Sequence, residues 1–189
     1  MPYRKFLFGN NQYFHLYNRG NNHGKIFFER ENYAYFLRLI RNHIPEEKTD
    51  VVAYCLMPTH YHVLGYTKSD GLSRQMQSLL LAYTKAINVR FKRTGSLFQG
   101  RFKAKMVTSN EVLLHLTRYI HLNPVAVGLV SKAEDWEYSS YRDYLGIRNG
   151  TLPKPDVILD QFHSREDYRK FVESIAPKDP DDFKDFLFE

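Results

Sequence analysis

The sequence predicts an α+β domain built on one antiparallel sheet. Between residues 12 and 107, short runs rich in Tyr, Phe and Val alternate with longer runs whose apolar residues recur at helical spacing. The order is strand, helix, strand, strand, helix, strand, which is the ferredoxin-like βαββαβ arrangement with helices on one face. In that arrangement the first and third strands are central. We expect a further helix and an irregular acidic tail after it.

The first half of the sheet follows from local patterns. Residues 12–19 are rich in Tyr and Phe and run into a turn-forming cluster, which indicates a strand. Residues 29–43 have apolar positions at helical spacing and are followed by Pro45, so we expect a helix there. Residues 51–57 and 60–67 read as two strands joined by a short turn.

The second half has equally local signals. Residues 71–91 carry an apolar stripe at helical spacing, and residues 102–107 alternate well enough to form the fourth strand. Thr108 and Glu111 then have the spacing of a capping box, which predicts the start of a third helix. Pro124 is expected to stop that helix.

Charge divides the chain into a basic body and an acidic tail. Residues 156–189 contain ten acidic and five basic residues, whereas residues 1–155 contain 22 basic and 11 acidic, a net charge of +11. Residues 71–110 hold eight basic residues and no acidic one, which favours a polyanionic partner such as nucleic acid. We therefore expect a domain at residues 1–150 and an acidic tail at 151–189. Such a tail is usually solvated and mobile, although it could also fold over the basic surface and restrain DNA entry.

Composition limits the class of protein further. The chain is long enough to bury a core, and 43% of its residues are hydrophobic, which excludes a wholly disordered protein. Its single cysteine, Cys55, cannot form an internal disulfide, and the chain starts without a signal-peptide pattern. We find no apolar run long enough to cross a membrane and expect a cytoplasmic protein.

Two histidines in the predicted strand 60–67 are the most informative residues. His60 and His62 are two apart, so both side chains project from one face of the sheet while Tyr61 and Val63 face the other. Neutral imidazoles held side by side suit a divalent metal. An isolated pair of this kind could equally be hydrogen-bonded core residues.

The third helix adds a second group of polar residues. Tyr119 and Asn123 are four apart and therefore share a helix face. A tyrosine on the same face as a metal-binding amide can attack a group that the metal polarises. His115 and His121 flank this face and could assist proton transfer, but we expect them to be surface residues. Tyr83 is a rival nucleophile, although it fits better in the apolar stripe of its own helix.

Four ordered segments resemble one known family. Residues 57–64 and 118–125 resemble the two signature motifs of the single-tyrosine HUH transposases, especially the REP-associated tyrosine transposases of bacteria, and residues 17–20 and 88–102 are also similar to that family. The similarity covers roughly residues 10–145. Tyr61 departs from the pattern, because the residue between the two histidines is usually aliphatic.

The resemblance implies a reaction and a site. It implies that His60, His62 and Asn123 bind Mg²⁺ or Mn²⁺, and that Tyr119 attacks single-stranded DNA beside a hairpin to form a 5′-phosphotyrosine, from which a 3′-hydroxyl can later reseal the strand. REP-associated relatives also imply a monomer rather than a homodimer. The basic residues that we expect to contact DNA are Arg19, Lys85, Arg90, Lys92, Arg93, Arg101, Lys103 and Lys105.

Two other functions are compatible with a domain of this class. One is a non-catalytic single-stranded nucleic-acid binding module on the same sheet, and the other is a metal-dependent hydrolase that releases its product with water. Among the basic residues, Arg101, Lys103 and Lys105 alternate on the predicted fourth strand, which favours contact with the DNA backbone over scattered surface charge.

Overall fold

The predicted sheet is present in the computed structural model, which describes residues 8–174. Four antiparallel strands pair in the order β2-β3-β1-β4, so the first and third strands are central as expected. The strands are β1 (Gln12–Arg19), β2 (Thr49–Met57), β3 (His60–Thr67) and β4 (Lys103–Met106).

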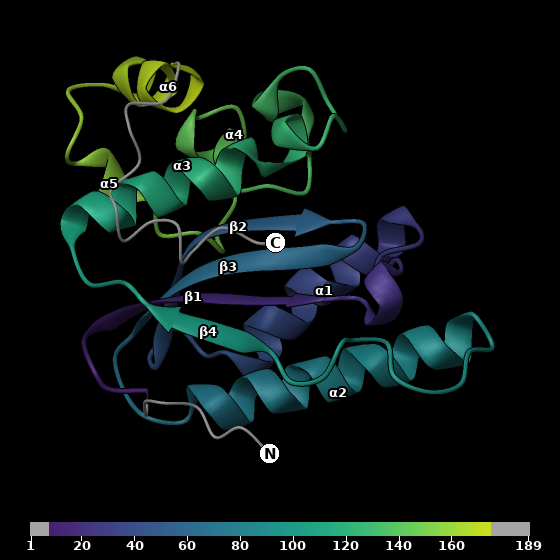
Figure 1. The fold of residues 1–189 in the computed structure, drawn as a ribbon. Helices are drawn as coiled ribbons and strands as arrows, with labels where there is room; N and C mark the ends of the chain where they lie inside the picture. Colours follow the sequence, from purple (N-terminus) through teal and green to yellow (C-terminus); the bar gives the residue numbers. More distant parts are fainter. Residues whose placement is uncertain (1–7, 175–189) are drawn as a thin grey trace.

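Helices cover both faces of this sheet, as Figure 1 shows. On one face lie α1 (Arg30–His43) and α2 (Leu72–Arg90), and on the other lies α3 (Asn110–Ala126). Three short helices pack beyond α3, namely α4 (Tyr141–Tyr144), α5 (Asp156–Leu159) and α6 (Arg165–Glu173). Two 3-10 turns, η1 (Asn21–His23) and η2 (Ala133–Asp135), complete the described elements.

Strand alternation divides the apolar residues between two cores. Phe14, Leu16 and Tyr61 pack with α1 and α2, whereas Cys55 and Leu64 pack with α3 and the segment after it. Successive side chains of a strand point to opposite faces, so a central strand serves both cores. His62 therefore faces α3 while its neighbour Tyr61 faces α1.

The boundaries of α3 differ from the expected ones. The N-cap is Ser109 rather than Thr108, because the Ser109 hydroxyl accepts a hydrogen bond from the backbone N–H of Val112 at 3.2 Å. Pro124 does not end the helix, which continues to Ala126. A proline lacks a backbone donor and its ring crowds the carbonyl of residue i−4, but Pro124 lies in the last turn of α3, which ends two residues later. Asn123 is consequently held within the helix.

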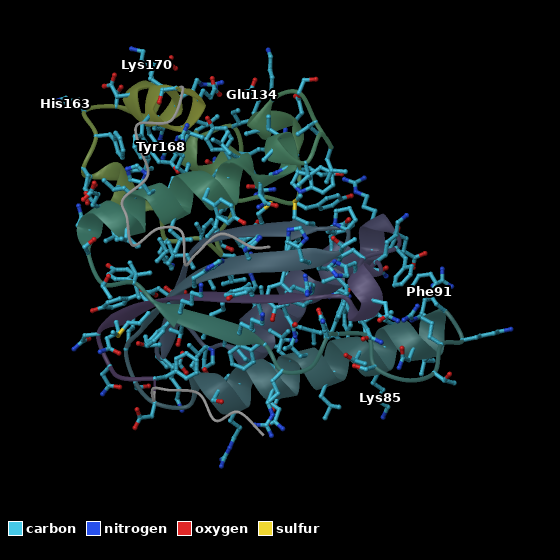
Figure 2. All side chains as sticks on the ribbon, viewed as in Figure 1. Lys85, Phe91, Glu134, His163, Tyr168 and Lys170 are labelled. Carbon is cyan, nitrogen blue, oxygen red and sulfur yellow. The ribbon has the colours of Figure 1, made fainter. Side chains whose placement is uncertain are left out.

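The segment after residue 150 is more ordered than we expected. Lys154 donates its backbone N–H to Val51 at the edge of β2, and α6 forms where a short helix was expected. Tyr168 and Val172 of α6 are buried, and Figure 2 shows Tyr168 on the side of α6 that faces α3. Residues 156–174 thus pack against α3 rather than forming a solvated end, and the rest of the acidic tail lies outside the described residues. Every helix between residues 8 and 174 is too short or too polar to cross a bilayer.

Candidate active site

The two histidines of β3 lie on the face of the sheet that α3 covers. In the strand register, His62 stands opposite Tyr17 of β1 and Cys55 of β2, and His60 stands opposite Arg19 and Met57. His62 is fully buried and His60 is half-buried. The ring centroids of the two imidazoles are 5.0 Å apart. The predicted projection of both rings to one side is confirmed.

Both ring nitrogens of His60 have partners. Its Nδ1 lies 3.0 Å from the Thr59 hydroxyl, and its Nε2 lies 3.1 Å from Oδ1 of Asn123. Burial lowers the pKa of His60, and the hydrogen bond with Asn123 acts in the opposite direction. The contact between His60 and Asn123 joins the sheet to α3 at the place where the sequence predicts two metal ligands.

His62 is held by a third histidine that the sequence analysis did not single out. Nε2 of His15 on β1 lies 2.9 Å from Nδ1 of His62, and both residues are fully buried. Burial lowers the pKa of His15 to about 3 and that of His62 well below its usual value, with a further contribution from the neighbouring histidines to His62. Both rings are therefore neutral at neutral pH.

Tyr119 and Asn123 project together from α3 toward the histidines, as the spacing predicts. The ring of Tyr119 is half-buried and meets the ring of His62 edge to face, with a centroid distance of 5.4 Å and an interplanar angle of 77°. Asn123 follows one turn later and reaches His60. One chain thus brings together the phenol, two imidazoles and the carboxamide.

The rival tyrosine is remote from this group. Tyr83 is fully buried between the sheet and α2, where its hydroxyl donates to the backbone carbonyl of Ile26 at 2.7 Å. Burial raises the pKa of this phenol. Tyr83 is a core residue on the opposite face of the sheet from His62.

The histidines of α3 are not surface residues, contrary to our expectation. His121 is fully buried, with Nδ1 2.7 Å from the Tyr168 hydroxyl and Nε2 2.8 Å from the Ser140 hydroxyl. His115 is also buried and meets the ring of Phe171. Both face α6, which supplies Tyr168 to His121 and Phe171 to His115.

The predicted DNA-contacting residues fall into two groups. Lys103 and Lys105 stand opposite Tyr17 and His15 in the β1–β4 register, so they share the sheet face of the histidines. Arg19 shares that face beside His60 and bonds to Gln99. Arg101 precedes β4, so it does not alternate with the two lysines on a strand as we expected.

The other four basic residues lie on α2 or just after it, on the opposite side of the sheet. Lys85 is exposed and projects from α2 away from the sheet in Figure 2. Arg90 forms an ion pair with Glu29 at 3.0 Å, and Arg93 lies over the ring of Phe28. Lys92 is in the turn that follows α2. The structure does not bring this group together with Lys103 and Lys105.

The proposed donor atoms are two imidazole nitrogens and one amide oxygen, and a divalent cation held by them would complete its coordination with water and phosphate oxygens. Two ligand atoms in neighbouring octahedral positions around Mg²⁺ lie about 3 Å apart, which is close to the 3.1 Å between His60 Nε2 and Asn123 Oδ1. Within residues 8–174, the side chains form no cluster of three His, Cys, Asp or Glu that could hold a metal. The amide oxygen of Asn123 is therefore the proposed third side-chain ligand beside the two histidines.

This chain is similar to a known protein family and to two curated relatives. The model of the family described as "Transposase IS200 like" matches residues 9–123. A putative REP-associated tyrosine transposase of Haemophilus influenzae is 29% identical over 103 residues, which are 49% of this chain and 58% of the relative. A REP-associated tyrosine transposase of Escherichia coli is 23% identical over 122 residues, which are 61% of this chain and 70% of the relative. The aligned part thus spans little more than half of the Haemophilus relative.

A solved structure shares the fold. It is described as a REP-associated tyrosine transposase bound to a REP hairpin, and it superposes with a TM-score of 0.65 at 20% identity, covering 82% of this chain and 90% of that one. At this identity the similarity establishes the fold alone.

Proposed function

We propose, because this chain belongs to the IS200-like transposase family, that it cuts and rejoins single-stranded DNA next to hairpins through a covalent tyrosine intermediate. The observation that carries the proposal is the meeting of Tyr119 with His62, 5.4 Å between ring centroids, beside the 3.1 Å contact of His60 with Asn123. A non-catalytic binding module can use a tyrosine to stack on a base, but it has no need for one beside two imidazoles and a carboxamide.

His60, His62 and Asn123 are the residues that would hold Mg²⁺ or Mn²⁺. When bound, the cation supplies positive charge beside the scissile phosphate, whose own charge otherwise repels a nucleophile. Burial favours the neutral form of both imidazoles, which is the form that binds a cation. Each ring is also oriented through Nδ1, which contacts Thr59 in His60 and His15 in His62.

Tyr119 is the proposed nucleophile. Its phenol oxygen forms a bond to phosphorus, while the bond from phosphorus to the 3′ oxygen of the preceding nucleotide breaks. The phenol proton passes to water, and the released 3′ oxygen takes one up. Helix α3 fixes Tyr119 and Asn123 one turn apart, so the same element presents the attacking oxygen and the amide that would hold the cation. The phosphotyrosine conserves a phosphodiester, which a 3′-hydroxyl can later attack to reseal the strand without ATP.

The proposed substrate is hairpin-containing single-stranded DNA. A relative with this fold is described as bound to a REP hairpin. In this chain, Lys103, Lys105 and Arg19 lie on the sheet face of the histidines, where they can follow the phosphates of a strand that enters the site.

One assay separates the candidate functions. The full chain is incubated with Mn²⁺ and end-labelled hairpin oligonucleotides carrying single-stranded flanks, and the products are separated on a denaturing gel. We expect a protein–DNA adduct that disappears in Tyr119→Phe and in His62→Ala. Cleavage without an adduct would identify a hydrolase, and binding without cleavage would identify a non-catalytic module. Either result would refute the transposase reaction.

We propose that one subunit suffices for each cut. The phenol and the proposed cation ligands meet within one chain, so no partner has to donate a tyrosine. Mixing Tyr119→Phe protein with His62→Ala protein tests this. A site within one chain stays inactive in the mixture, whereas recovered adduct formation would show that the tyrosine is exchanged between subunits.

A further inference from the structure

A buried histidine of β1 contacts the proposed cation site from within the core. His15 is fully buried, and its Nε2 lies 2.9 Å from Nδ1 of His62. Both residues belong to the two central strands, and His15 stands opposite Leu64, the next inward-facing residue of β3 after His62. In the proposed reaction this third imidazole serves only to anchor the ring of His62.

We propose that His15 is a positioning residue that holds His62 as the Nδ1–H tautomer and so directs Nε2 of His62 to the cation. The inference rests on the proposed function, because it concerns the same cation site. A hydrogen bond between two neutral imidazoles needs one N–H donor and one lone pair. A metal binds an imidazole through a nitrogen that carries no proton. Since Nδ1 of His62 faces His15, Nε2 is the nitrogen that can face a cation, and the ring proton must then sit on Nδ1.

The direction of the hydrogen bond follows from this assignment. Nδ1–H of His62 donates, and Nε2 of His15 accepts, so His15 itself carries its proton on Nδ1. In proteins, a metal-binding histidine almost always donates its other ring N–H to a carboxylate, carbonyl or water. Here the acceptor is a second neutral imidazole, which orients the ring without adding negative charge to the site.

His15 is placed to hold this orientation firmly. Its ring stacks on that of Tyr17, with centroids 4.7 Å apart and an interplanar angle of 25°. The rings of His15 and His62 lie 5.1 Å apart and within 18° of parallel. Because both residues are buried on strands that pair along their whole length, close packing restricts rotation of the His15 ring away from His62.

At the other proposed ligand, His60, Nε2 also lies on the side of α3, although without metal it carries the ring proton because it faces Oδ1 of Asn123, which can only accept. Nδ1 of His60 contacts the Thr59 hydroxyl, and Nε2 points to Asn123. Both imidazoles therefore present Nε2 on the side of α3. Thr59 contacts Nδ1 of His60 from a half-buried turn, whereas His15 contacts Nδ1 of His62 from the interior. We therefore expect cation affinity to be more sensitive to substitution of His15 than of Thr59.

Nuclear magnetic resonance of the full wild-type chain, with ¹⁵N-labelled histidine, tests the tautomer directly. At neutral pH and without metal, we expect His62 to show a protonated Nδ1 and an unprotonated Nε2, and His15 to show the same pattern. A His62 ring protonated at Nε2 would overturn the inference. This measurement requires no variant to fold and no enzymatic activity.

Binding of Mn²⁺, followed by electron paramagnetic resonance, tests the consequence. Loss of an outer partner of a metal ligand typically lowers affinity by about 10–100-fold, and we expect a loss of this size in His15→Phe. In His15→Gln, whose amide oxygen can accept the same hydrogen bond, most of the affinity should return. Leu64→Ala is the matched control, because it opens a cavity opposite His15 but leaves the hydrogen bond in place. It should lower the melting temperature and keep the affinity.

The outcomes separate this inference from the proposed function. If wild-type protein binds Mn²⁺ and His62→Ala does not, but His15→Phe binds as well as wild type, only the role of His15 is refuted. If wild-type protein shows no Mn²⁺ binding that depends on His62, the cation site of the proposed function fails, and the inference fails with it. Equal losses in His15→Phe, His15→Gln and Leu64→Ala would show a merely structural role and would also overturn it.

Discussion

The guanidinium of Arg118 donates from Nε to the backbone carbonyl of Val172 at 3.0 Å, which fastens α6 to the helix that carries Tyr119. The same Nε lies 3.0 Å from the carbonyl of Phe171, and Nη2 reaches that of Ser174. Carbonyls at the end of a helix have no partners within it and carry partial negative charge, so a cation there stabilises the helix. Arg118 and Tyr119 are adjacent, yet they face α6 and the sheet respectively.

We expect Arg118→Met to destabilise the C-terminal segment. Hydrogen bonds to charged groups contribute about 1.5–3 kcal/mol each, and the change leaves several carbonyls of α6 without this donor. Urea unfolding should show a loss of about 2–4 kcal/mol, and hydrogen exchange should show the largest loss of protection in α6. Lys170→Ala is the control, because its exposed ion pair with Asp167 should contribute less than about 1 kcal/mol. Equal losses in both variants would contradict the bridging role of Arg118.

Tyr168→Phe should weaken the same contact between α6 and α3 without opening a cavity. The change removes the hydroxyl that lies 2.7 Å from Nδ1 of His121, and a buried polar atom left without its partner costs about 1–3 kcal/mol. The measurement is the free energy of unfolding in urea. Tyr66→Phe is matched in size, but its hydroxyl bonds to Asn11 at the surface, so we expect a change below about 0.5 kcal/mol. An unchanged free energy of unfolding in Tyr168→Phe would show that the contact with His121 does not stabilise the fold.

Local patterns were sufficient to predict the sheet and the pair of residues on α3. Alternation fixes which face His60 and Tyr61 take, and a separation of four residues places Tyr119 and Asn123 together. These relationships lie within one element, so they can be read without knowing the tertiary structure. The family resemblance then supplied the link between β3 and α3.

The role of His15 could not be read in the same way. Its contact with His62 depends on the β1–β3 register, which joins residues 47 positions apart. His121 was misjudged for a related reason, because its polar partners Ser140 and Tyr168 come from segments whose packing no local pattern reveals. The basic run at residues 71–110 looks continuous in the sequence, but α2 and β4 place its charges on opposite sides of the sheet.

Cys55 should be inert toward thiol reagents in the folded protein. Its side chain is fully buried, and burial raises the pKa of the thiol. A raised pKa means fewer thiolates at any given pH, and the thiolate is the reactive form. With Ellman's reagent at pH 8 we expect reaction only as fast as the protein unfolds, and full reaction in urea. Rapid modification without denaturant would contradict the buried position of β2.

Lys103 and Lys105 should contribute to DNA affinity while Lys85 should not. The first two share the sheet face of the histidines, whereas Lys85 projects from α2 on the other side. Each lost phosphate contact to single-stranded DNA should lower the slope of log affinity against log salt by about 0.7. We therefore expect a smaller slope and weaker binding of a hairpin oligonucleotide in Lys103→Ala and Lys105→Ala, measured by fluorescence anisotropy at several salt concentrations. Lys85→Ala removes the same charge and should match wild type. If all three variants lose equal affinity, net charge rather than position governs binding, and DNA does not follow the β4 side of the sheet.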